Sequence, residues 1–158
     1  MNNTIWLYIA LGVWVAYNLP IVIIYGIQSS VSSTYNLFED IWRRSLMSWF
    51  IAGVAIPMTI VADNILGFLS ALFLLLVFVA PTVRKSTFDR YLHVIGADMG
   101  LAFGMASLLF INWHWWWLIL TFAVFTIASM RNGYKNHTYW IETIGFVIIW
   151  VGLFIEKT

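Results

Sequence analysis

The 158-residue sequence contains no cysteine, and charged residues make up only 9% of it. The lack of cysteine excludes disulfides, thiol nucleophiles and thiolate metal ligands. Soluble domains contain about 25% charged residues, so this chain has too few to cover a soluble surface. Its net charge of +1 provides no basic face, which argues against a nucleic-acid partner.

Hydrophobic residues, in contrast, make up 62% of the chain and occur along its whole length. A helix needs about 20 apolar residues, with a range of about 17 to 25, to cross the hydrocarbon core of a bilayer. Six stretches are of about this length, at 5–26, 45–61, 65–83, 92–111, 115–130 and 139–155, the second and fifth being short. The sequence therefore predicts an all-α polytopic integral membrane protein, a compact bundle of six transmembrane helices with short loops, forming one domain over residues 1–158.

Arginine and lysine are unevenly distributed among the predicted loops. Only Lys157 lies on the side of the second and fourth loops. The other basic residues fall in the first, third and fifth loops, and they are Arg43, Arg44, Arg84, Lys85, Arg90, Arg131 and Lys135. Short loops rich in basic residues remain in the cytoplasm. We therefore expect these three loops to be cytoplasmic and both termini to lie outside, in the inner (plasma) membrane of a bacterium.

The stretch NWHWWW at 112–117 places four tryptophans at the outer turn between the fourth and fifth spans. Indole rings favour the headgroup level, where the ring is sheltered and its N–H stays wet. We interpret the cluster as an interfacial anchor, with His114 as one of its polar members. Binding of a sugar or a quaternary amine is the alternative interpretation.

Two carboxylates lie inside predicted spans, both near the cytoplasmic side. They are Asp98 in the fourth span and Glu142 in the sixth. An ionised carboxylate facing lipid costs about 2.5–3.5 kcal/mol, so we expect Asp98 to face protein or water, or to be protonated. Asp98 follows His93 by five residues, which is about 140° around a helix. The two side chains therefore cannot ligate one ion from a straight helix.

Gly96, Gly100 and Gly104 form a ridge of small residues along the fourth span, at spacing i, i+4, i+8. Such a ridge lets a second helix approach closely. The sequence leaves open whether that helix belongs to the same chain or to another copy.

The first cytoplasmic loop, at 27–45, is the longest and contains several hydroxyl groups. One interpretation is a solvated connector whose aromatic residues lie in the membrane interface. The other is that VSSTY (31–35) folds back against the inner ends of the spans and completes a polar pocket at headgroup level. The candidate pocket residues are Ser32, Thr34, His93, Asp98 and Glu142, and the candidates for attracting a lipid phosphate are Arg43, Arg44 and Arg84.

Three segments together resemble the six-span family that includes the DRAM, FRAG and Sfk-type membrane proteins and related small bacterial membrane proteins. These segments are VSSTY (31–35), HVIGA (93–97) and YWIE (139–142). The chain departs from the family pattern at Ser33 and Tyr35, which replace an aspartate and a glycine, and its basic residues place the first loop in the cytoplasm. The resemblance implies a role in lipid or membrane homeostasis rather than a catalytic activity.

These observations favour a non-enzymatic membrane protein that binds lipid or a partner through the cytoplasmic-leaflet pocket. Alternatives are a proton- or ion-coupled transporter using Asp98 and Glu142, a metal-dependent intramembrane lipid hydrolase, and an accessory subunit or phage or mobile-element effector. We expect no cofactor and no metal. The expected partners are membrane lipids, with another membrane protein or a second copy of the chain as further possibilities.

Overall fold

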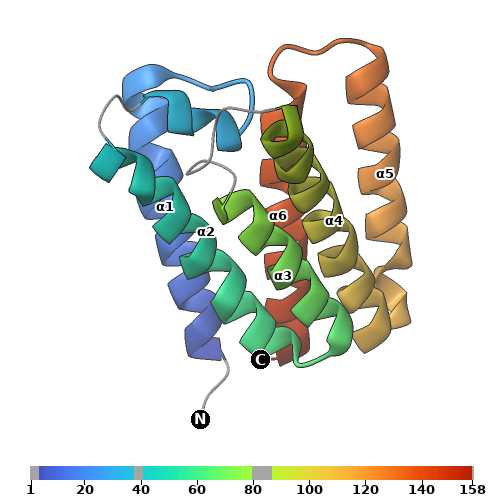
Figure 1. Ribbon diagram of the computed structural model, residues 1–158. Coiled ribbons are helices and arrows are strands. Elements are labelled where there is room, and N and C mark those ends of the chain that lie inside the picture. Colours follow the sequence, from blue (N-terminus) through green and yellow to red (C-terminus); the bar gives the residue numbers. More distant parts are fainter. Residues whose placement is uncertain (1–3, 38–40, 80–86, 158) are drawn as a thin grey trace.

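The computed structural model describes residues 4–37, 41–79 and 87–157, with the backbone alone at 35–36, 41–44, 78–79 and 87–90 (Figure 1). Within these ranges the chain is helical and contains no strand. The α-helices are α1 (Thr4–Tyr25), α2 (Ile41–Ala62), α3 (Ile65–Val79), α4 (Thr87–Ile111), α5 (Trp116–Arg131) and α6 (His137–Lys157). Two short 3-10 helices, η1 (Ser32–Leu37) and η3 (Trp113–Trp115), lie in the connections.

The prediction of an all-helical chain is confirmed for the described residues. Five of the described helices are long and apolar enough to cross a membrane. The described part of α3 has 15 residues and extends about 22 Å of the roughly 30 Å of a hydrocarbon core. The end of the predicted third span, at 80–83, lies outside the described residues.

Two helices begin about a turn or more before the apolar runs that predicted them. The predicted spans start at 45 and 92, whereas α2 begins at Ile41 and α4 at Thr87. The early residues include Arg43, Arg44 and Arg90. Hydropathy marks only the stretch that suits hydrocarbon, but the hydrogen-bonded backbone continues as a helix into the polar region where arginine is tolerated.

Successive helices run in opposite directions, so the connections divide between two ends of the bundle (Figure 1). The η1 segment and the α5–α6 turn, with Arg131 and Lys135, share one end, which we call the basic end. The start of α1, the end of α6 and the η3 segment share the other, which we call the tryptophan end. Helix α3 packs against α2 and α4, α6 packs against α1, α2 and α4, and α5 lies at the edge against α6.

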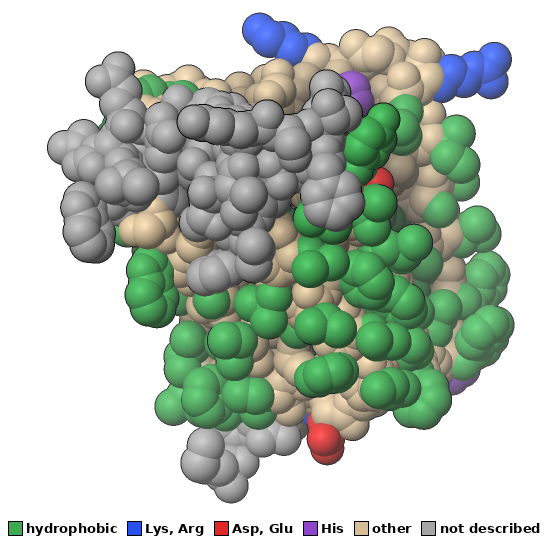
Figure 2. All heavy atoms as spheres, viewed as in Figure 1, with side chains coloured by type: hydrophobic (Ala, Val, Ile, Leu, Met, Phe, Trp, Pro, Cys, Tyr) green, Lys and Arg blue, Asp and Glu red, His purple; other side chains and the backbone are tan. Residues whose placement is uncertain are grey.

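On the face seen in Figure 2, many hydrophobic side chains are exposed between the two ends of the bundle. Every helix contributes to this belt, with examples at Ile23, Trp49, Phe68, Phe110 and Ile127, each more than half exposed. Soluble monomers rarely expose continuous apolar patches larger than a few hundred Å². The surface therefore suits an apolar surrounding better than water.

The turn between α2 and α3 is held by one asparagine. Asp63 has a φ of +49°, and Asn64 Oδ1 accepts the Gly67 N–H over 2.9 Å, which caps the start of α3. The Asn64 amide also donates to Ser107 Oγ over 2.8 Å. The turn is thereby attached to α4 at the tryptophan end.

The glycine ridge of α4 faces α3, and its C-terminal glycine, Gly104, also faces α6. A Cβ on Gly96 would lie 2.8 Å from the Phe73 carbonyl oxygen, and one on Gly100 would lie 2.8 Å from Leu74. A Cβ on Gly104 would lie 2.6 Å from Ile149 of α6. The ridge therefore serves close packing within the described bundle.

Candidate functional site

The segment after α1 folds back over the first turns of α6. The Val31 N–H donates to Glu142 Oε2 over 2.5 Å, and the Ser32 backbone N–H lies next to the same carboxylate. The Tyr139 N–H donates to the Ser29 carbonyl over 3.2 Å. The Asn136 amide donates to the Ile27 carbonyl over 2.9 Å. These contacts attach the first part of the loop to the start of α6 and to the turn before it.

Thr34 fixes the loop from inside. Its side chain is 0% exposed, and its Oγ1 donates to the Val31 carbonyl over 2.6 Å. Because the single threonine proton is used there, the Tyr17 hydroxyl is the donor in its 2.8 Å contact with Thr34 Oγ1. Thr34 therefore holds the loop in shape and connects it to α1, rather than presenting a group to a ligand.

The serines stabilise the same turn. The Ser33 hydroxyl donates to the Ser30 carbonyl over 2.7 Å and accepts the Ser30 N–H over 3.1 Å. The Ser30 and Ser32 hydroxyls lie 3.0 Å apart. Local side-chain to backbone bonds of this kind set turn geometry.

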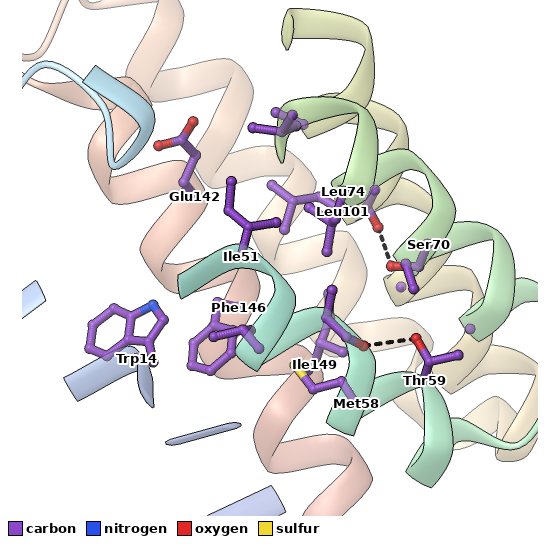
Figure 3. A pocket seen from close by; sticks show the side chains of 18 of the residues that line it. Trp14, Ile51, Met58, Thr59, Ser70, Leu74, Leu101, Glu142, Phe146 and Ile149 are labelled. Atoms are coloured by element: carbon purple, nitrogen blue, oxygen red, sulfur yellow. Dashed lines mark hydrogen bonds between the residues drawn. The ribbon is translucent and has the colours of Figure 1, made fainter. Parts of the chain in front are cut away.

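A cavity of about 130 Å³ lies between α2, α3, α4 and α6, with Trp14 of α1 on one side (Figure 3). Its lining on α6 extends from Glu142 to Leu153, which is about 16 Å along the helix. An engineered apolar cavity of about 150 Å³ stays dry and binds benzene. A cavity of this size and composition therefore favours an apolar group over water.

The hydroxyl groups along the cavity wall are satisfied within the protein. Ser70 Oγ donates to the Gly100 carbonyl over 2.7 Å, and Thr59 Oγ1 donates to the Ala55 carbonyl over 2.8 Å, both visible in Figure 3. Ser107 bonds to the Asn64 amide. The wall is consequently apolar toward the interior, and the ionisable group in its lining is Glu142 at the basic end.

The structure brings together only some of the candidate pocket residues. Ser32 and Glu142 line the cavity, and Thr34 supports the loop beside them. His93 is half-buried near the start of α4, and Asp98 is exposed; neither lines the cavity. Asp98 lies opposite the glycine ridge because two residues from Gly96 or Gly100 is about 200° around the helix.

The candidate phosphate-attracting arginines fall outside the part of the molecule whose side chains are described. Arg43 and Arg44 lie in the first turn of α2, where only the backbone is described, and Arg84 lies outside the described residues. Among the residues that are described, no three histidine or carboxylate side chains are grouped so as to hold a metal ion.

The tryptophan end contains a second carboxylate contact, which is partly buried. Glu156 Oε1 accepts from the Asn112 amide and from the Trp115 indole N–H, each over 2.8 Å. Trp113 and Trp117 are more than half exposed. Trp115 thus differs from its neighbours, because it attaches the α4–α5 turn to the end of α6.

Sequence reasoning missed Tyr17 and Glu156 as structural residues. The partner of Tyr17 is 17 residues away in the sequence, and the two partners of Glu156 are 41 and 44 residues away. Neither belongs to a motif or a periodic pattern. The one available signal was a polar group inside an apolar span, for Tyr17, or directly after one, for Glu156, where an unpaired group is costly.

A comparison of the chain with protein-family models, with curated proteins and with solved structures found no match in any of the three.

Proposed function

We propose that this chain is a non-enzymatic membrane protein that binds a membrane lipid, with an apolar chain in the central cavity and the polar part at the basic end. The observation that supports this proposal most strongly is the asymmetry of the cavity. Its wall is apolar for about 16 Å, and Glu142 with the backbone of the loop lies at one end. An amphiphile has the same asymmetry.

The proposed setting is a bacterial inner membrane crossed six times, with the basic end in the cytoplasm and both termini outside. The belt of exposed hydrophobic side chains supports insertion. Arg131 and Lys135 lie at the end that contains the Glu142 loop, which supports the orientation. In this orientation the polar end of the cavity lies near the inner headgroup level.

Affinity for a lipid must come mainly from the polar end of the site. An acyl chain that moves from bilayer to cavity exchanges one apolar environment for another, so the hydrophobic effect contributes little. Packing against the cavity wall favours acyl chains whose shape fits the cavity. The acceptor groups of Glu142 and the loop favour a headgroup that donates hydrogen bonds, such as an amine or a hydroxyl.

Filling the cavity is expected to reduce lipid binding. Ala97 lines the cavity from α4, and Ala97→Leu would place three additional carbon atoms against the space. We expect at least a tenfold loss of the co-purifying lipid, measured by native mass spectrometry after release from detergent micelles.

Ala102→Leu provides the matched control, since Ala102 lies on the same helix but is exposed. It should retain the lipid in wild-type amounts. Circular dichroism and unfolding midpoints of both variants without added lipid separate lost binding from lost folding. Equal lipid retention by two well-folded variants would contradict the proposal.

A further inference from the structure

A second cavity, of about 310 Å³, lies between the end of α5 and the start of α6 at the basic end. It is separate from the central cavity, with which it shares no lining residue. The lining residues are Phe125, Ser129, Tyr134, Lys135, His137, Trp140 and Ile144. Apolar rings, hydroxyl groups and two basic side chains thus meet in one place.

The electrostatic environment of this cavity favours an anion. Lys135 and His137 line it, and Arg131 ends the neighbouring helix. The sequence has no aspartate or glutamate between Asp98 and Glu142, and the first turn of α6 contains no acidic residue. The start of a 21-residue helix adds the positive end of its dipole.

Two side chains in the lining are prepared to donate hydrogen bonds. His137 Nδ1 lies 3.1 Å from the Tyr134 carbonyl; because a carbonyl only accepts, Nδ1 carries a proton, and Nε2 is left to meet a ligand. Nε2 donates to an anion when the ring is in its doubly protonated, imidazolium form. Ser129 is 1% exposed, and its Oγ has no hydrogen-bond partner in the described part of the chain. A buried hydroxyl without a partner is unfavourable unless an acceptor reaches it.

We propose that this α5–α6 cavity binds the phosphate group of an anionic membrane lipid. Lys135 and His137 contact the phosphate, and Ser129 donates to one of its oxygens. Trp140 and Tyr134 lie at the same level, where amphipathic rings favour the headgroup region. Phe125 and Ile144 supply an apolar floor for the first part of the acyl chain. This floor favours a lipid over a free phosphate ion.

The test measures phosphatidylglycerol retained by purified protein in nanodiscs of phosphatidylcholine with a small fraction of phosphatidylglycerol. We expect Lys135→Gln to weaken retention about fivefold, with a further loss in the Lys135→Gln, His137→Gln double variant. Lys157→Gln makes the same change in net charge at the opposite end and should retain the lipid. Equal losses in the Lys135→Gln and Lys157→Gln variants would overturn the proposal, because they would indicate a general charge effect.

Ser129→Ala separates binding from packing. If the hydroxyl meets the phosphate, this variant retains less phosphatidylglycerol although its lipid-free unfolding midpoint is equal to or above that of the wild type. Unchanged retention would overturn the role of Ser129. Inorganic phosphate alone should give no stabilisation at millimolar concentration; stabilisation equal to that by the lipid would overturn the lipid assignment. Ala97→Leu, which fills the central cavity, should leave phosphatidylglycerol retention at the α5–α6 cavity unchanged. The proposal for the α5–α6 cavity is therefore tested independently of the proposal for the central cavity.

Discussion

Replacing Glu142 with alanine is expected to release the loop after α1 from α6 and to lower the free energy of unfolding by about 3 kcal/mol. The Glu142 carboxylate accepts the Val31 N–H and lies next to the Ser32 N–H. Removing it leaves the Val31 donor without that acceptor and takes the negative charge away from the Ser32 N–H, and a buried unsatisfied donor costs about 1–3 kcal/mol. Equilibrium unfolding in mixed micelles measures the loss, and amide hydrogen exchange at Val31 and Ser32 should become faster.

Two further variants define this effect. Glu142→Gln retains one acceptor oxygen and should fall between wild type and Glu142→Ala. Asp98→Ala removes a carboxylate from a predicted span, but Asp98 is exposed, so it should change stability by less than about 0.5 kcal/mol. If Asp98→Ala and Glu142→Ala were equally destabilising, the attachment of the loop would not be the cause.

Gly96→Ala is expected to lower the free energy of unfolding by about 1–3 kcal/mol, although alanine favours helices. The new Cβ would lie 2.8 Å from the Phe73 carbonyl oxygen and 3.0 Å from Val77. A backbone oxygen cannot move aside as the end of a side chain does, so α3 and α4 must separate. Unfolding in mixed micelles measures the change, and weaker α3–α4 contact should also enlarge the central cavity.

Gly12→Ala is the matched control for Gly96→Ala. Gly12 lies within α1, and a Cβ there would meet nothing within 4 Å. Alanine in place of glycine in a helix interior is favourable by about 0.5–1 kcal/mol. The two substitutions should therefore have opposite signs. A similar destabilisation by both would show that the space around the ridge is not the cause.

The helices were predictable because one physical signal, an apolar run of membrane length, marks each of them. That signal also explains the errors at their ends. It does not report where a helix continues into a polar region, as α2 and α4 do before their apolar runs.

For the candidate site, the sequence could predict which segments come together, but not the contacts between their residues. Ser32, Thr34 and Glu142 are close together because the loop folds back, and the sequence indicated this as one of two interpretations. It could not indicate that the Glu142 carboxylate meets backbone N–H groups. Helical angles predict that His93 and Asp98 lie on different faces of α4, but they could not place either residue relative to a cavity formed by other helices.

The α5–α6 cavity had no sequence signal of its own. Ser129, Lys135 and His137 are separated by irregular spacing and match no motif. Their proximity depends on the turn at 132–136, in which Gly133 and Asn136 have φ values of +62° and +59°. Turn geometry of this kind is set locally, but its consequence for a cavity is visible only in three dimensions.

Site-directed labelling across α3 tests the six-crossing orientation most directly, because the chain contains no native cysteine to interfere. Asp63 and Tyr91 are exposed and lie on the two sides of α3, in the α2–α3 turn and near the start of α4. With a membrane-impermeant maleimide on intact cells, Asp63→Cys should react from outside and Tyr91→Cys only after permeabilisation. Reaction of both positions from the same side would contradict the account.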